Sequence, residues 1–203
     1  MKRSGNDSSK KQVLVLYSTG SGSTRLIAET IAQALGETAE ISLTEVDENR
    51  QFWPDPSRFD AVIAGSAIRY DRWLKPMSDY VKTFEKELSR KPVSFFFSCL
   101  SLAGGEAGQM SARKYEAWIR NLAPVVRPLD IRGFAGTLNY GAMPVWARLP
   151  FRTAMLFTGL KEGDYRNFSE IRDWAKEQMG VIHRTWQEDV QTARQSLTSL
   201  AQV

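Results

Sequence analysis

Residues 13–36 constrain the fold of this chain most strongly, because a strand, a glycine- and hydroxyl-rich turn and a helix follow one another without interruption. Val13 to Tyr17 are apolar and mostly β-branched or aromatic, as expected of a strand buried on both faces of a parallel sheet. The turn from Ser18 to Thr24 carries two glycines and five hydroxyl side chains. Glycine lets the backbone approach a ligand, and the start of a helix points free N–H groups and the positive dipole end at an anion. The segment therefore predicts a phosphate-binding site.

Residue identity separates the kinds of phosphate loop that this turn could form. A Walker A loop ends in Gly-Lys-Ser or Gly-Lys-Thr, which this chain lacks, so hydrolysis of ATP or GTP is not expected. A dinucleotide loop needs a third glycine where this chain has Arg25, although Glu45 stands at the spacing of a ribose-binding acid. A flavin mononucleotide (FMN) loop, in which hydroxyls and backbone amides surround a terminal phosphate, fits best. A Ser/Gly-rich connection without a ligand is the remaining alternative.

Length and composition fit one compact domain with a substantial core, at 203 residues, 42% hydrophobic and 25% charged. The single cysteine, Cys99, excludes an intramolecular disulfide framework and suits a reducing cytosol. No run of about 18 apolar residues is present, so no segment is expected to span a membrane. The net charge of +4 favours an anionic ligand or surface. The chain has no RNA-binding signature or helix-turn-helix pattern, so nucleic acid is not an expected partner.

Strand-like and helix-like segments alternate along the chain, which is typical of a parallel sheet covered by helices. After the first strand, the expected strands are residues 40–46, 59–66, 93–98 and 131–138. The expected helices are residues 24–36, 73–90 and 110–122, with a last one from about 167 that can continue past Gly180. This rhythm predicts an α/β fold with a flavodoxin-like, doubly wound sheet of five parallel strands in the order 2-1-3-4-5, with helices on both faces.

Sheets of this order bind ligands at the carboxyl ends of their strands. The loops expected at that edge are residues 18–24, 66–73 and 98–108. The second loop offers aromatic rings for a flat isoalloxazine and cations for acidic substrate groups, while the third is small and polar enough to reach a ring edge. Because such aromatics and arginines commonly serve packing or solvation, the residues alone leave the roles of Arg69 and Tyr70 open.

Several motifs extend the similarity beyond the phosphate loop. They are LYSTGSGSTRLIAETIA at the first loop, VIAGSAIRY at the second, FFFS and GFAGTLNYG at the ends of strands four and five, and the late TGLKEGDYRNFSEIRDWA. Together they cover most of residues 13–178. The chain resembles the flavodoxin superfamily and, within it, the menaquinone-dependent protoporphyrinogen IX dehydrogenases (protoporphyrinogen oxidases) of haem biosynthesis. The combination of GSAIRY with a long segment before the last helix is what resembles the dehydrogenases more than other flavodoxins.

The resemblance implies FMN as the cofactor, and the flavin itself would carry the chemistry without an acid–base dyad. In flavodoxins the first loop binds the phosphate, which implies that role for Thr19, Gly20, Ser21, Gly22, Ser23 and Thr24. The other two loops flank the isoalloxazine, which implies that role for Ala67, Ile68, Arg69, Tyr70, Ser98, Cys99, Leu100, Ser101 and Leu102.

The resemblance further implies oxidation of protoporphyrinogen IX to protoporphyrin IX, with the electrons passed to menaquinone or ubiquinone. Because guanidinium forks match carboxylates, the candidates for pairing with the substrate propionates are Arg69, Arg72, Arg148 and Arg152. A flavodoxin-like NAD(P)H:quinone reductase and a non-enzymatic FMN electron-transfer module are the alternatives. Small flavodoxin carriers are typically strongly acidic, and the net charge of +4 argues against that last role.

We expect a disordered lead-in over residues 1–11, an FMN-binding domain over 12–180 and a helical extension or tail over 181–203. Residues 139–160 form an insertion of interspersed apolar and cationic side chains, suited to packing on the protein body, lining a pocket or lying on a membrane surface. No metal site is expected, because His183 has no nearby Cys or His partner. The resemblance implies a cytoplasmic location and leaves open a homo-oligomer and peripheral contact with the inner face of the cell membrane.

Overall fold

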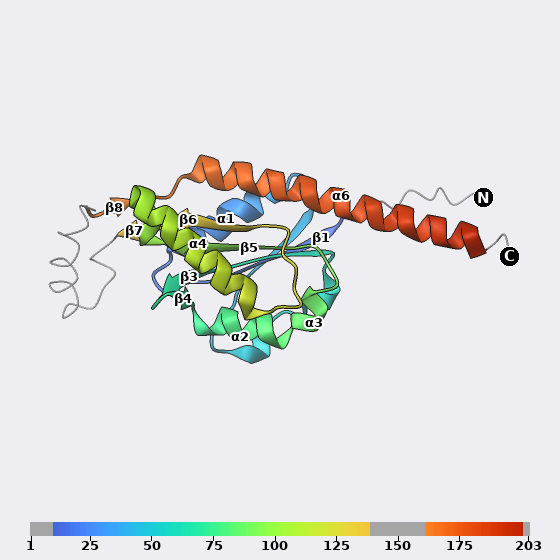
Figure 1. Ribbon diagram of the computed structural model, residues 1–203, viewed down its shortest axis with the longest axis horizontal. Helices are drawn as coiled ribbons and strands as arrows, with labels where there is room; N and C mark the ends of the chain where they lie inside the picture. The colour runs from blue at the N-terminus through green and yellow to red at the C-terminus, as the bar shows by residue number, and fades with distance from the viewer. Residues whose placement is uncertain (1–9, 139–160, 201–203) are drawn as a thin grey trace.

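A five-stranded parallel sheet forms the centre of the computed structural model, which describes residues 10–138 and 161–200 (Figure 1). The strand order is β2-β1-β3-β5-β6, and all of these neighbours pair in parallel. This confirms the predicted doubly wound sheet. The strands are β1 (Gln12–Ser18), β2 (Glu40–Glu45), β3 (Ala61–Arg69), β5 (Val93–Cys99) and β6 (Ile131–Ala135).

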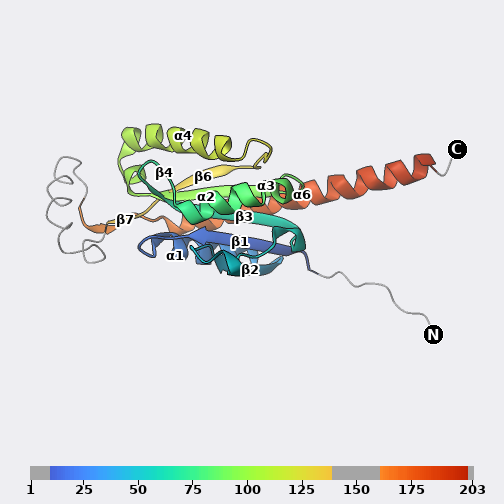
Figure 2. The same cartoon turned by 90° about the horizontal axis from the view of Figure 1, so that it is seen from below.

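Helices cover both faces of the sheet (Figures 1 and 2). On one face, α1 (Ser23–Leu35) packs against α6 (Phe168–Leu200). On the other lie α2 (Lys75–Thr83), α3 (Glu85–Leu88) and α4 (Gly105–Leu122). Short 3-10 helices connect these elements: η1 (Arg50–Phe52), η2 (Pro56–Arg58) and η3 (Leu100–Ala103).

Alternation along β1 explains why its residues 13–17 are all apolar. Val13, Val15 and Tyr17 point into the core under α1 and α6. Leu14 and Leu16 point into the core under α2, α3 and α4. Because both faces of the strand are buried here, none of these five positions favours a polar residue.

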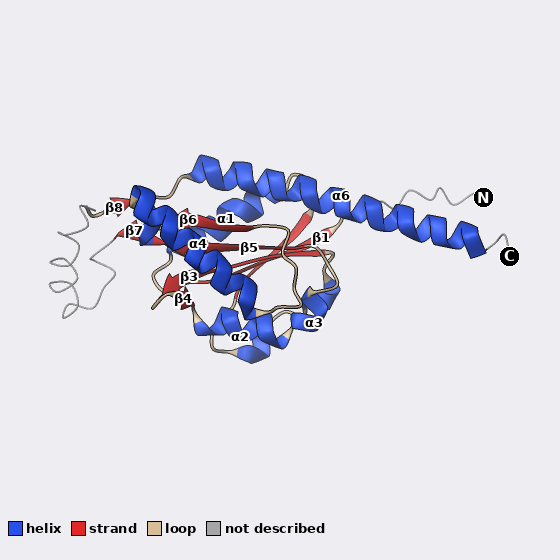
Figure 3. Ribbon diagram, viewed as in Figure 1, coloured by secondary structure: helices blue, strands red, loops and turns tan. Residues whose placement is uncertain are grey.

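Two antiparallel strand pairs lie at one end of the sheet, visible as short red arrows in Figure 3. The strand β4 (Arg72–Trp73) folds back on β3. Beyond β6, the strand β7 (Thr137–Leu138) pairs with β8 (Gly163–Asp164). The expected fifth strand, residues 131–138, is therefore divided at Gly136, where the chain leaves the main sheet.

The element boundaries at this end differ from those expected. The strand β3 runs on to Arg69, so Ala67, Ile68 and Arg69 belong to a strand that continues through its pairing with β4. The helix expected over 73–90 begins at Lys75 and is interrupted at Phe84, whose backbone (φ −106°) is not helical. The loop expected over 98–108 contains η3, and α4 begins at Gly105 instead of residue 110.

The last helix, α6, continues without interruption through Gly180. Its first half contributes Ile171, Trp174, Ala175 and Ile182 to the core. Further along, the described side chains from Gln187 to Gln195 are exposed, and Figures 1 and 3 show this part of the helix extending past the sheet. Within the described ranges, no helix is both long and apolar enough to cross a membrane. The predicted insertion at 139–160 and residues 1–9 of the predicted lead-in lie outside the described residues.

Candidate functional site

Strand register brings the predicted loops to one edge of the sheet. Ser18 of β1 lies beside Ser66 of β3, and Ala67 of β3 lies beside Ser98 of β5. Cys99 at the end of β5 lies beside Ala135 of β6. The loops that leave these strands therefore start from a common edge, at the switch point where a sheet of this order binds its ligand.

The first loop has the backbone geometry of an anion site. Gly22 adopts a left-handed conformation (φ 85°), and its N–H donates to the Thr19 hydroxyl at 2.9 Å. The helix α1 begins at Ser23 without a side-chain cap. Its first N–H groups therefore lack a side-chain acceptor and point, with the positive helix dipole, toward the loop.

Some hydroxyls of this loop are hydrogen-bonded within the protein, and others are free to bind a ligand. Ser18 donates to the carbonyl of Val46. The Thr24 hydroxyl lies 2.7 Å from that of Ser98, and both residues are buried. Ser23 differs, because its hydroxyl oxygen is buried and has no hydrogen-bond partner among the described residues. An unpaired buried hydroxyl is costly, so Ser23 and the exposed Ser21 are the hydroxyls suited to a bound anion.

A cavity of about 550 Å³ opens between this loop and the β7–β8 strand pair. Ser21, Gly22 and Ser23 line one side of it, and Asp164 and Arg166 line the other. The Arg166 guanidinium donates two hydrogen bonds to the Asp164 carboxylate, from Nε to Oδ1 at 2.8 Å and from Nη2 to Oδ2 at 2.6 Å. These hydrogen bonds hold the pKa of Asp164 below its usual value, so this carboxylate is charged at neutral pH.

Gly136 lies close to both the first loop and the third loop. Its N–H donates to the carbonyl of Cys99 at 3.2 Å. A β-carbon at this position would lie 3.6 Å from the Ser23 hydroxyl. Gly136 therefore lies between the start of α1 and the end of β5.

The β3–β4 hairpin presents Arg69, Tyr70 and Arg72 to solvent. Tyr70 is 88% exposed, and the Arg69 guanidinium lies 6.0 Å from the centre of its ring. Tyr70 and Asp71 both adopt positive φ angles, 51° and 62°, which residues other than glycine rarely adopt. Such backbone strain needs support from its surroundings.

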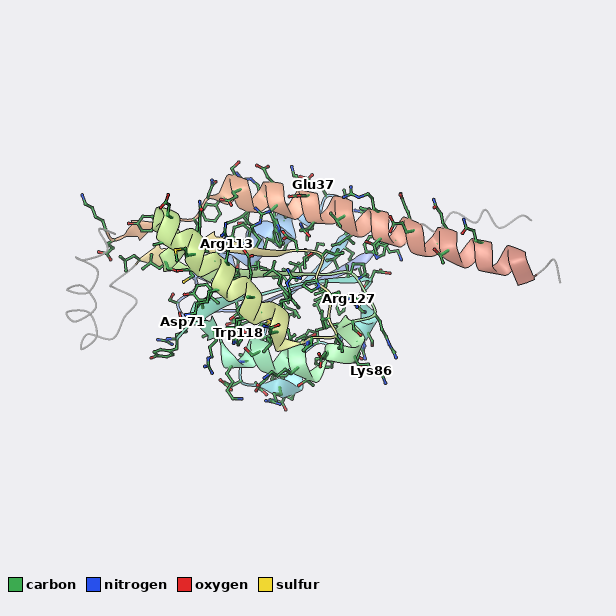
Figure 4. All side chains as sticks on the ribbon, viewed as in Figure 1. Glu37, Asp71, Lys86, Arg113, Trp118 and Arg127 are labelled. Carbon is green, nitrogen blue, oxygen red and sulfur yellow. The ribbon has the colours of Figure 1, made fainter. Side chains whose placement is uncertain are left out.

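That support comes from α4. The Asp71 carboxylate accepts hydrogen bonds from Lys114 at 2.6 Å and from the Tyr115 hydroxyl at 3.1 Å; Figure 4 shows Asp71 beside α4. The Lys114 bond, and next that of Tyr115, lower the pKa of Asp71. Burial, followed by the neighbouring Cys99 and Asp71, raises the pKa of Tyr115 to about 12. At neutral pH, Asp71 is therefore charged and Tyr115 is a donor.

The third loop is a turn of 3-10 helix. Leu100, Ser101 and Leu102 lie in η3 and are half-buried. Cys99 is half-buried as well, and its sulfur lies 3.1 Å from the Ser101 hydroxyl. Since the loop is regular and packed, it offers a fixed wall to a ligand.

The structure thus joins the first and third loops directly, through Thr24 and Ser98. Arg69 and Arg72 lie apart from the first loop, on a cavity of about 430 Å³ bounded by the hairpin, α2 and α4. Arg148 and Arg152 lie outside the described residues. Sequence reasoning assigned no role to Asp164 or Arg166, although their Asp-x-Arg spacing within the late motif was a usable signal for a local ion pair.

Residues 14–163 match the family model of the flavodoxin domain. The chain belongs to the flavodoxin domain family. This membership confirms the predicted FMN cofactor, since FMN lies at the β1/β3 switch point of the flavodoxin fold. The uncapped start of α1 and the orphaned Ser23 hydroxyl fit its phosphate.

Named relatives of this flavodoxin domain chain align over most of its length. One from Leishmania major, named protoporphyrinogen IX dehydrogenase (quinone), is 27% identical over 84% of this chain and 75% of its own. The protein of the same name from Escherichia coli (strain K12) is 26% identical over 86% of this chain and 96% of its own. A solved flavoprotein in complex with FMN from Lactobacillus acidophilus NCFM is 17% identical, with a TM-score of 0.47, over 61% of this chain and 93% of that one.

Proposed function

We propose that this flavodoxin domain protein oxidises protoporphyrinogen IX to protoporphyrin IX and passes the electrons to a quinone. The observation that carries the proposal is the name shared by relatives that align over 84% and 86% of the chain. A quinone acceptor in the lipid would bring a cytoplasmic protein to the inner face of the cell membrane.

The first loop would hold the FMN phosphate. Its donors are the Ser21 and Ser23 hydroxyls and the N–H groups of Gly20, Ser21, Ser23 and Thr24. Thr19 would shape the loop, since its hydroxyl already accepts the Gly22 N–H. The Thr24 hydroxyl is committed to Ser98, so Thr24 would contribute its backbone and brace the third loop.

The other two loops would flank the isoalloxazine. Ala67, Ile68, Arg69 and Tyr70 would lie on one side, and residues 98–102 on the other. The exposed ring of Tyr70 suits stacking on a flat ligand. When bound, FMN supplies hydride transfer, while the protein fixes the ring and orients the substrate against it.

Arg69 and Arg72 would pair with the porphyrinogen propionates. Both guanidinium groups lie on the exposed hairpin that also carries Tyr70, so a substrate stacked near the flavin would bring its carboxylates within their reach. Arg148 and Arg152 are further candidates from the insertion.

Anaerobic mixing of the FMN-loaded protein with protoporphyrinogen IX and a soluble quinone tests the proposal. We expect porphyrin fluorescence to grow faster than in a control without protein, and only when quinone is present. Retention of yellow FMN without such growth would contradict the proposal. Bleaching of the flavin by NAD(P)H would then indicate a nicotinamide-dependent quinone reductase.

A pair of variants tests the arginine assignment. Arg69→Ala should raise the KM for protoporphyrinogen by about tenfold, because it removes a charge-assisted hydrogen bond, and leave FMN bound. Arg58→Ala is the matched control, since Arg58 is also exposed but precedes the amino end of β3. Unchanged substrate kinetics in Arg69→Ala would remove Arg69 from the site.

A further inference from the structure

We propose that Arg166 pairs with the phosphate of FMN and that Asp164 positions it for this role. The inference rests on the proposed cofactor site and adds to it a residue far away in the sequence. The Arg166 side chain is only 8% exposed and lines the same cavity as Ser21, Gly22 and Ser23. Its Nη1 lies 3.4 Å from the carbonyl oxygen of Ser23, in the first turn of α1.

The guanidinium is held rigidly but keeps hydrogen-bonding capacity. Asp164 binds Nε and one N–H of Nη2, and its Oδ1 also accepts the backbone N–H of Arg166. The ring of Phe168 lies 5.0 Å from the guanidinium carbon. A guanidinium carries five N–H donors in a fixed plane, so after these contacts the terminal nitrogens still have donors for an oxyanion.

The charge of a bound phosphate is larger than the positive charge that the first loop itself supplies, so a nearby cationic side chain would stabilise it. A phosphate monoester carries a charge of about −1.5 to −2 at neutral pH, and a helix N-terminus supplies roughly +0.5. Residues 19–24 contain no charged side chain. The neighbouring Arg25 is 59% exposed and pairs with Glu29 at 2.8 Å. The described lining of the cavity contains one basic residue, Arg166, and two acidic residues, Glu162 and Asp164.

Two independent features of the cavity point to an anion. The Ser23 hydroxyl oxygen is buried without a partner in the described part of the chain, and a buried guanidinium lines the same cavity. Asp164 is 44% exposed and Glu162 is exposed as well, so water screens these carboxylates more than the guanidinium. The guanidinium is therefore the charge of the lining that water screens least, and it lies beside the first turn of α1.

Binding of FMN and of riboflavin to the apoprotein separates a phosphate contact from a purely structural role. The two ligands share the ring and ribityl chain, and riboflavin lacks the phosphate. We expect Arg166→Gln to weaken FMN binding by about 10- to 100-fold, the range of a charge-assisted hydrogen bond, with riboflavin affinity unchanged. Arg166→Lys should recover part of the loss, and Asp164→Asn should give a smaller, FMN-specific loss. Arg25→Gln is the matched control and should change neither affinity.

Equal weakening of both flavins in Arg166→Gln would show a structural role and overturn the inference. So would unchanged FMN affinity with a raised KM for porphyrinogen, which would assign Arg166 to substrate carboxylates. If Arg166→Gln does not fold, the folded Asp164→Asn variant decides by the same ratio of affinities. A wild-type protein that binds no FMN would refute the proposed cofactor site itself, whereas normal FMN binding with an unchanged ratio in the variants would refute the role of Arg166 alone.

Discussion

The hydroxyls of Thr24 and Ser98 lie 2.7 Å apart inside the protein and join the first turn of α1 to the end of β5. Thr24 is 0% exposed and Ser98 is 4% exposed. We expect Thr24→Val to lower the free energy of unfolding by about 1–3 kcal/mol, because it leaves the Ser98 hydroxyl buried and unpaired. Adding Ser98→Ala should recover part of this loss. Urea unfolding of the two single variants and the double variant measures the coupling, and strictly additive costs would mean that the two hydroxyls do not interact.

Gly22 and Gly20 form a matched pair in the phosphate loop. A β-carbon at either position would meet no atom within 4 Å, but only Gly22 has a positive φ, of 85°. Gly22→Ala should therefore cost about 1–2 kcal/mol of stability through backbone strain and also weaken FMN binding. Gly20→Ala should change stability little. Thermal unfolding and flavin titration of both variants check this, and an equally costly Gly20→Ala would contradict it.

Gly65 leaves room for the ring of Phe96 on the neighbouring strand. A β-carbon at position 65 would lie 2.4 Å from the Cε1, Cε2 and Cζ atoms of that ring. Phe96 is fully buried, so the ring cannot move into solvent. We expect Gly65→Ala to destabilise the protein by about 1–3 kcal/mol through overpacking. Gly163→Ala is the control, since nothing lies within 4 Å of its added carbon, and chemical denaturation should show a much smaller effect there.

The contacts of Asp71 with α4 predict a pH-dependent stability. Hydrogen bonds from Lys114 and then Tyr115 lower the pKa of Asp71 in the folded protein. Their contribution should be fully present above the unfolded value of about 3.9 and be lost as the pH falls through the lower, folded value. Asp71→Asn should therefore lower the melting temperature at pH 7, and its difference from wild type should shrink in acid.

Lys114→Met tests the partner of this contact. It should reproduce most of the loss at neutral pH and reduce the pH dependence of stability, because the Lys114 hydrogen bond is the largest cause of the shift. A difference between wild type and Asp71→Asn that stays constant from pH 7 down to about pH 2 would contradict the assignment.

Local patterns were sufficient to predict most of the sheet. The continuous apolar run of β1 follows from burial on both faces, and α1, over Ser23–Leu35, lies within one residue of the helix expected over 24–36. The β3–β4 hairpin was not predicted, because its turn places Tyr70 and Asp71 in left-handed backbone where sequence rules expect glycine or asparagine. That turn depends on Lys114, which is 43 residues away in the sequence.

The site shows the same limit. The phosphate loop could be predicted because strand, turn and helix are contiguous in the sequence. The different environments of the Ser23 and Thr24 hydroxyls could not be predicted. The Thr24 hydroxyl meets Ser98, which is distant in the sequence, while the buried Ser23 hydroxyl has no hydrogen-bond partner among the described residues. Arg166 reaches Ser23 across 143 residues, a separation that no local pattern specifies.

The pairing of Leu138 with Gly163 has a consequence for how this fold can diversify. The chain leaves the sheet through β7 and returns through β8, so the two ends of the intervening segment are clamped together beside the phosphate loop. The entropic cost of closing a flexible loop rises by only about 0.6 kcal/mol for each doubling of its length. Evolution can therefore lengthen, shorten or exchange this segment at little entropic cost, while the sheet and its flavin loop stay unaltered.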